Sequence, residues 1–106
     1  MADYLGEFEQ LILLALVRLG DDAYGVTIRE TLLDRAGRDV SFGAIYSTLR
    51  RLEAKGLVAS ELGESEPVRG GRAKKYIRVL APGRAALKAS QRALGRMAQG
   101  LKGFES

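Results

Sequence analysis

A run of small, polar and cationic side chains between residues 41 and 54 recurs at helical spacing. At about 100° per residue, the apolar side chains of this segment share one arc, which contains Phe42, Ile45, Leu49 and Leu52. The opposite arc carries Gly43, Ala44, Ser47, Arg50, Arg51 and Ala54. Small residues let a helix approach base edges in the major groove, and arginines farther along reach guanine or phosphate. The pattern predicts a helix that reads DNA; an ordinary surface helix with a solvated cationic face is the alternative.

Both ends of this helix are marked in the sequence. Ser41 is a residue type that caps helix N-termini, because its hydroxyl oxygen accepts a hydrogen bond from a free backbone N–H. At the other end, Lys55-Gly56-Leu57 is typical of a C-terminal cap in which Gly56 adopts the left-handed conformation and Leu57 packs back on the last turn. The reading helix is therefore expected between these two caps.

Strands are expected on both sides of a second cationic segment. Residues 58–62 and 76–80 alternate in polarity, which predicts the two strands of a hairpin. The connection between them carries Arg69, Arg72, Lys74 and Lys75. Such side chains are suited to lying along a phosphate backbone or entering a minor groove. Because Glu61, Glu64 and Glu66 occupy the same hairpin, a loop that only aids solubility is the alternative.

Two more helices are expected before the reading helix. Apolar residues recur at helical spacing over residues 5–19, and over residues 11–17 they surround the helix almost completely. Such a helix must be covered on more than one side, which implies a partner subunit. After a break at residues 20–22, the spacing predicts a second helix over about residues 24–35, with Asp22 or a neighbour as its cap.

The last expected element begins at Pro82, because proline suits the first turn of a helix. From there a seam steps by alternating threes and fours, with a serine as its polar gap: Leu87, Ser90, Leu94, Met97, Leu101 and Phe104. This heptad spacing is typical of a helix that packs against another helix. A homodimer interface is expected from this seam together with Leu11 and Leu14. A helix that packs only against its own domain is the alternative.

Composition excludes several classes of function. The chain has no cysteine and no histidine, so disulfides, thiolate metal sites and the commonest catalytic side chain are missing. The acidic residues are scattered rather than convergent, so neither an enzyme nor a cofactor is expected. The longest apolar run, residues 11–17, is too short to cross a bilayer, and residues 1–4 lack the cationic start of a signal peptide. A cytoplasmic location without membrane contact is expected.

Charge is divided unevenly along the chain. Residues 1–40 contain four arginines and eight carboxylates, a net charge of −4, whereas the whole chain carries +4. Residues 41–106 therefore hold a net charge of +8. A polyanion would be attracted to the second part and repelled by the first, so binding should be oriented rather than diffuse.

Three helices, a hairpin and a last helix, in this order, predict a mainly α (α+β) protein with a winged helix-turn-helix fold. At 106 residues the chain is expected to form one small unit. Within it, residues 1–80 would form the DNA-binding domain and residues 81–106 a C-terminal dimerisation helix. Double-stranded DNA and a second copy of the chain are the expected partners.

Five segments of the chain together resemble the PadR family of bacterial transcriptional regulators. They are residues 9–16, 23–25, 41–53, 71–76 and 83–87, which extend over nearly the whole chain. Their specific features are a Tyr-Gly pair at the start of the second helix, a tyrosine and an Arg-Leu-Glu sequence in the third, and lysines directly before a tyrosine in the second strand.

The resemblance implies a homodimeric repressor whose third helix and wing bind a near-palindromic operator. It implies that the C-terminal helix packs against the partner's N-terminal region, and that a small-molecule effector binds at the dimer interface of some relatives. By the same resemblance Tyr46 lies at the DNA backbone, and the residues at the groove are Ser41, Gly43, Ala44 and Ser47. Relatives that sandwich planar drugs often use a tryptophan in the C-terminal helix, and this chain has none.

A winged-helix module that binds protein rather than DNA is the alternative function, because a hydrophobic pattern does not encode function. An apolar patch on the third helix would indicate such a module. The sequence instead places Ser47, Arg50 and Arg51 there.

Overall fold

Three helices enclose the core of the protein. The computed structural model describes residues 4–63 and 74–104, in which α1 (Glu7–Leu19), α2 (Gly25–Ala36) and α3 (Phe42–Ala54) follow one another. A short 3-10 turn, η1 (Gly20–Asp22), separates α1 from α2. The most deeply buried side chains come from all three helices and include Ile12, Leu13, Ile28, Leu32, Ile45 and Leu52. The apolar arcs expected from the sequence therefore meet in one core.

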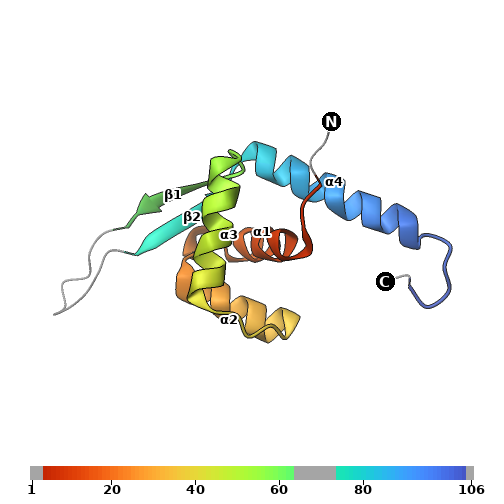
Figure 1. Ribbon diagram of the computed structural model, residues 1–106, viewed down its shortest axis with the longest axis horizontal. Coiled ribbons are helices and arrows are strands. Elements are labelled where there is room, and N and C mark those ends of the chain that lie inside the picture. Colours follow the sequence, from red (N-terminus) through yellow and green to blue (C-terminus); the bar gives the residue numbers. More distant parts are fainter. Residues whose placement is uncertain (1–3, 64–73, 105–106) are drawn as a thin grey trace.

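Helix α1 lies at the centre of this arrangement and contacts α2, α3, α4 and β2 (Figure 1). Its nearly continuous apolar surface is thus covered largely from within the protomer. Leu14 and Val17 are the exceptions, since both remain exposed. Of the helices in residues 4–63 and 74–104, none combines the length and the apolar character needed to span a membrane.

A two-stranded hairpin follows α3 and forms the wing. Strands β1 (Val58–Leu62) and β2 (Lys75–Val79) are antiparallel, with Val58 opposite Val79. The prediction for β1 is confirmed, whereas β2 begins and ends one residue earlier than expected. Leu80 is the N-cap of the next helix instead, and its backbone N–H donates to the carbonyl of Leu57 at 2.9 Å.

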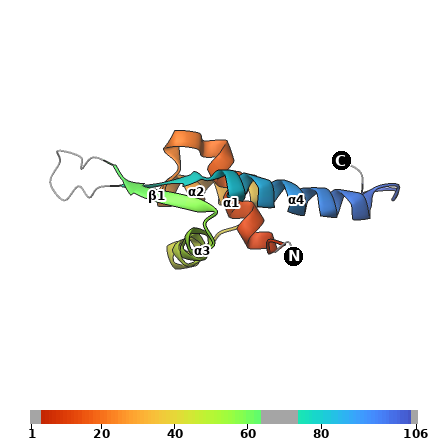
Figure 2. The same ribbon diagram turned by 90° about the horizontal axis from the view of Figure 1, so that it is seen from above.

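The last helix, α4 (Ala81–Ala98), extends away from the core on the side opposite the hairpin (Figure 1). Seen from above, the hairpin and α4 form one line, and α3 protrudes to one side of it (Figure 2). Pro82 lies in the first turn of α4, as expected. The predicted fold class is confirmed: three helices, a wing and a further helix make a mainly α winged helix-turn-helix.

The caps of α3 are those expected, whereas the start of α1 and the cap of α2 differ. The Ser41 hydroxyl accepts the Ala44 N–H at 3.1 Å, and Gly56 has a φ of 75°. Helix α1 begins at Glu7 rather than at residue 5. For α2 the sequence predicts Asp22 or a neighbour as the cap; Asp22 is not the cap, because Tyr24, two residues later, is the N-cap residue and its N–H donates to the Thr27 hydroxyl at 3.0 Å.

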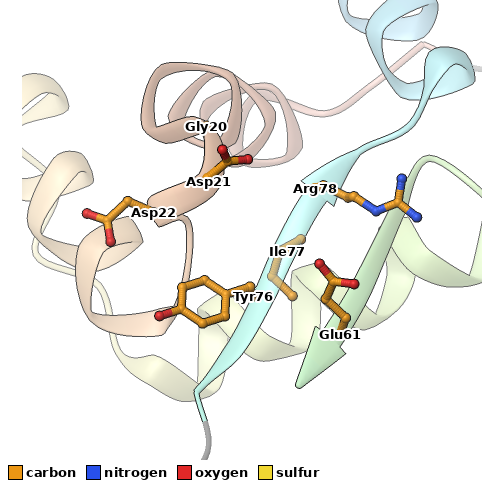
Figure 3. A pocket seen from close by; sticks show the side chains of 7 residues that line it. All are labelled: Gly20, Asp21, Asp22, Glu61, Tyr76, Ile77 and Arg78. Carbon is orange, nitrogen blue, oxygen red and sulfur yellow. The ribbon is translucent and has the colours of Figure 1, made fainter. Parts of the chain in front are cut away.

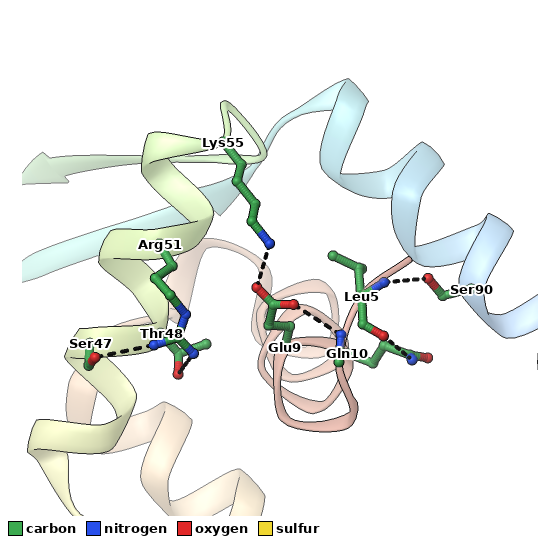
Figure 4. A network of polar contacts seen from close by, with 9 residues as sticks. Leu5, Glu9, Gln10, Ser47, Thr48, Arg51, Lys55 and Ser90 are labelled. Atoms are coloured by element: carbon green, nitrogen blue, oxygen red, sulfur yellow. Dashed lines mark hydrogen bonds and ion pairs between the residues drawn. The ribbon is translucent and has the colours of Figure 1, made fainter. Parts of the chain in front are cut away.

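A carboxylate with little solvent exposure joins the start of α1 to the end of α3. Glu9 accepts the Gly6 N–H at 3.0 Å and the Lys55 ammonium at 2.9 Å (Figure 4). Burial alone would raise the pKa of Glu9, but the Gly6 N–H, Lys55 and Arg51 together outweigh it and hold that pKa below its ordinary value of 4.5. The ionised form of Glu9 therefore stabilises the folded chain.

Replacing Glu9 with glutamine is expected to lower the free energy of unfolding at pH 7 by about 1.5 kcal/mol, because charge-assisted hydrogen bonds are lost. Since the folded pKa is lowered, the wild-type advantage is complete above pH 4.5 and is lost as pH falls through the folded pKa. Urea unfolding at a series of pH values measures this difference. Glu7→Gln, which removes an exposed ion pair to Arg38, is the control and should cost about 0.5 kcal/mol or less. A Glu9→Gln deficit that persists undiminished in acid would contradict the assignment.

Candidate nucleic-acid interface

The outward face of α3 is small and cationic. Ile45, Leu49 and Leu52 are buried against the core, while Gly43, Ala44, Arg50, Arg51 and Ala54 are exposed. The Ser41 hydroxyl caps the helix as an acceptor and keeps its own hydrogen for donation. The protruding position of α3 leaves this face accessible (Figure 2).

The apolar arc of α3 differs by one position from the expected one. Phe42 was expected in this arc, but its side chain is 38% exposed, whereas Thr48 is only 2% exposed. Phe42 stacks on Tyr46 with ring centres 6.3 Å apart, and the guanidinium of Arg29 lies 5.1 Å from the Phe42 ring. The start of α3 thus carries exposed aromatic surface in addition to its small residues.

Two of the residues predicted to face the DNA groove are hydrogen-bonded to each other. Arg51 donates to the Ser47 hydroxyl at 3.3 Å and to the Thr48 hydroxyl at 3.1 Å (Figure 4). Ser47 is half-buried, and the Arg51 guanidinium that bonds to its hydroxyl lies over it. Arg50 is exposed and takes part in none of the ion pairs found among the described residues. Arg50 is therefore the arginine of α3 that is better placed to contact another molecule.

A small cavity lies between the reading helix and the wing. Its volume is about 90 Å³, and its lining includes Tyr46 and Arg50 of α3 together with Lys75 of β2. Glu53 also lines it and accepts a hydrogen bond from the Ser60 hydroxyl at 2.9 Å. The structure thus gathers a tyrosine, an arginine and a lysine from the predicted set at one junction.

The base of the wing contacts the start of α2. The Lys74 ammonium lies 4.6 Å from the centre of the Tyr24 ring, and the Tyr24 and Tyr76 rings meet edge to face at 5.5 Å. Tyr24 is not among the residues predicted for the DNA interface, although the Tyr24-Gly25 pair is one of the features that resemble the PadR family. Arg69 and Arg72, the other two predicted wing contacts, lie outside the described residues.

The expected dimer seam on α4 divides into two parts. Leu87 is 7% exposed and Ser90 is 3% exposed, so both are already buried within the protomer. The serine at position 90 has a role within the protomer, because its hydroxyl accepts the Leu5 N–H at 3.2 Å (Figure 4). The remaining seam residues are exposed: Leu94, Met97, Leu101 and Phe104. The prediction that the helix continues to Phe104 is wrong, because α4 ends at Ala98 and Gly100 has a φ of 82°, so only Leu94 and Met97 of these four lie on the helix. Leu14 of α1 is also exposed, and Leu11 is half-buried.

Larger cavities lie elsewhere among the described residues, and two of them bear on function. One of about 300 Å³ separates η1 from the hairpin (Figure 3). Three carboxylates line it, Asp21, Asp22 and Glu61, against one cation, Arg78, which leaves an excess of negative charge. This charge is unsuited to phosphate, and the described residues contain no group of three His, Cys, Asp or Glu side chains that could hold a metal ion. The other, also about 300 Å³, lies between α1 and α2 and includes Leu11, Leu14, Arg18 and Arg35 in its lining.

Comparison with known proteins places this fold in a family. The model of the transcriptional regulator PadR-like family matches residues 13–89. A transcriptional regulator of Mycobacterium tuberculosis is 45% identical over 74 residues, which is 70% of this chain and 65% of that protein. The chain thus spans slightly less than two thirds of this curated relative.

Solved structures agree with this match. A PadR family transcription regulator from Clostridium difficile has a TM-score of 0.76 and 25% identity, over 93% of this chain and 98% of its own. A PadR family transcriptional regulator from Eggerthella lenta has a TM-score of 0.69 and 28% identity, over 90% of this chain and 82% of its own. With the family model covering most of the chain, from α1 to α4, the protein belongs to the PadR-like family of transcriptional regulators.

Proposed function

We propose that this protein is a transcriptional repressor that binds a near-palindromic DNA operator as a homodimer. The observation that carries the proposal is the protruding face of α3, where Gly43 and Ala44 precede Arg50 and where Tyr46 and Lys75 flank the same junction. A surface of small residues followed by cations suits a major groove better than it suits an apolar protein partner. Membership of a family of transcriptional regulators supports the same conclusion.

The geometry of DNA docking follows from the dimensions of α3. Its 13 residues give a helix of about 20 Å, which fits in the major groove. Gly43 and Ala44 would allow close approach to base edges, while Arg50 would reach guanine or phosphate. The wing cations would then contact the neighbouring backbone or minor groove: Arg69, Arg72, Lys74 and Lys75.

The homodimer is proposed from apolar side chains that the protomer leaves uncovered. Met97 is 78% exposed and Leu94 is 59% exposed, although both lie on the extension of the buried arc of α4. A second copy would cover them, together with Leu14 and the cavity between α1 and α2. Two-fold symmetry would place two reading helices on half-sites about 34 Å apart, which is why a near-palindromic operator is expected. A small-molecule effector would bind where the two copies meet.

A protein-interaction module is the second candidate, and one observation favours it. Three exposed apolar side chains gather where α2 meets the start of α3: Val26, Leu33 and Phe42. They border the reading face rather than replace it, because Gly43 and Arg50 are also exposed. A chain that captures protein through this patch and shows no preference among DNA sequences would favour the second candidate.

The proposal is tested by selecting bound duplexes from a random pool and measuring affinity for the selected sequence by fluorescence anisotropy. Arg50→Ala should cost about 1–3 kcal/mol if the side chain is bidentate to guanine. Lys75→Ala should weaken operator and random duplex alike and reduce the salt slope by about 1. Arg92→Ala removes the same charge as Arg50→Ala from the exposed side of α4 and should bind like wild type. Failure to enrich any sequence, or wild-type binding by Arg50→Ala, would count against the proposal.

A further inference from the structure

Three consecutive residues before and at the start of α2 contact both elements of the proposed DNA interface. The carbonyl of Ala23 accepts the N–H of Ile77 in β2 at 2.9 Å. Tyr24 contacts the base of the wing through its ring, and Gly25 lies directly against the Tyr46 hydroxyl of α3. Ala23 and Gly25 are buried. The segment 23–25 therefore lies between the reading helix and the wing.

We propose that residues 23–25 are a positioning element that fixes α3 and the wing relative to each other for DNA binding. Gly25 would act through Tyr46, and Tyr24 through Lys74. This inference rests on the proposed function, because the two positioned side chains are among the proposed DNA contacts.

Gly25 acts by leaving room for a ring. A Cβ atom added there would overlap the Tyr46 hydroxyl and would lie 3.0 Å from the ring carbon that bears it. The obstructed atom is the far end of a side chain that is 39% exposed, so Tyr46 can swing outward while the core stays packed. Alanine at position 25 should therefore displace Tyr46 without unfolding the protein.

Tyr24 acts by supporting a cation. Its ring faces the Lys74 ammonium at 4.6 Å and meets the Tyr76 ring edge to face, which orients the first residues of the return strand. The Tyr24 hydroxyl is 3.5 Å from the same ammonium, a distance at which a hydrogen bond is weak. The aromatic face is thus the part of Tyr24 that contributes most to the position of Lys74.

The first experiment compares wild type, Gly25→Ala, Tyr46→Phe and the double variant of the full chain by operator affinity and thermal unfolding. Gly25→Ala should weaken binding by about tenfold while its melting temperature stays close to that of wild type. In the Tyr46→Phe background the same change should have a much smaller effect, because the overlapping hydroxyl is gone. Equal losses of affinity in both backgrounds would overturn the role of Gly25.

The second experiment measures the salt dependence of DNA binding for Tyr24→Leu, with Tyr24→Phe as the matched control. Loss of the ring should release Lys74 from its position and lower the slope of log affinity against log salt by about 0.9, the value for one phosphate contact. Tyr24→Phe keeps the ring and should keep the wild-type slope. A wild-type slope in Tyr24→Leu would overturn the role of Tyr24.

A readout that needs no DNA separates this inference from the proposed function. Ring-proton NMR resonances of Tyr46, assigned from the Tyr46→Phe spectrum, should shift in Gly25→Ala. Unchanged Tyr46 resonances would overturn the inference even if the wild-type protein binds its operator. A wild-type protein that binds no duplex selectively, with shifted Tyr46 resonances, would overturn the proposed function and leave the positioning contact established.

Discussion

Replacing Gly83 with alanine is expected to lower the free energy of unfolding by about 3 kcal/mol, the upper end of the usual range for overpacking. Gly83 is buried in the first turn of α4, and an added Cβ would overlap the carbonyl oxygen of Leu57 and lie 3.0 Å from Val79. That oxygen belongs to the backbone and accepts the Leu80 N–H at 2.9 Å, so it cannot retreat without losing its partner. Urea unfolding followed by circular dichroism measures the loss.

The control for this prediction lies on the same helix. A Cβ added at Gly95 meets no atom of the described residues within 4 Å. Gly95→Ala should therefore stabilise the chain by up to about 1 kcal/mol, because alanine is the better helix former. If Gly83→Ala were as stable as Gly95→Ala, the close approach of α4 to Leu57 would be refuted.

The double variant Leu94→Glu, Leu101→Glu is expected to be monomeric, which is the largest effect on assembly that we predict. Both side chains are at least half exposed in the protomer, so the changes remove little of its own core. In the proposed dimer the carboxylates would be buried without partners, at a cost that exceeds the stability of most small interfaces. Sedimentation velocity should then give a mass near 11.5 kDa, whereas wild type should give twice that value.

A matched control introduces the same charges on the opposite side of α4. Ala85 and Ala89 are exposed, and neither belongs to the seam. The double variant Ala85→Glu, Ala89→Glu should stay dimeric at every concentration at which wild type is dimeric. Dimers that survive Leu94→Glu, Leu101→Glu, or a wild-type protein that is itself a monomer, would contradict the proposed interface.

The helices and strands could be predicted because spacing and caps are local properties of the chain. Ser41 and Gly56 bound α3 as expected, and residues 58–62 form β1 as expected. The inward arc of α3 was less certain, because threonine is compatible with either surface of a helix. The sequence therefore predicts Phe42 in the core of this helix, whereas the structure buries Thr48.

Contacts between distant segments could not be predicted in this way. No local rule indicates that Gly25 meets Tyr46 or that Gly83 meets Leu57, since each pair is joined only by the packing of whole elements. Ser90 fitted the heptad pattern as a polar gap, yet it accepts a hydrogen bond from Leu5 within the same protomer. Which of the exposed residues touch DNA or a second subunit stays a prediction.

The junction between β2 and α4 also has a mechanical consequence. Leu80 alone separates the end of β2 from the start of α4, and its N–H is bonded to the Leu57 carbonyl at 2.9 Å. Strand β2 is also held to the core by the Ile77 N–H, which donates to the Ala23 carbonyl, and α4 by the Ser90 hydroxyl, which accepts the Leu5 N–H. The Gln91 amide donates to the Gln10 side chain, so the part of α4 that extends beyond these contacts is residues 92–98, an arm of about 10 Å, and a tilt of about 5° moves its tip by about 1 Å. A force on that tip therefore acts first on the contacts between α4 and α1, before it reaches the strand that carries Lys75.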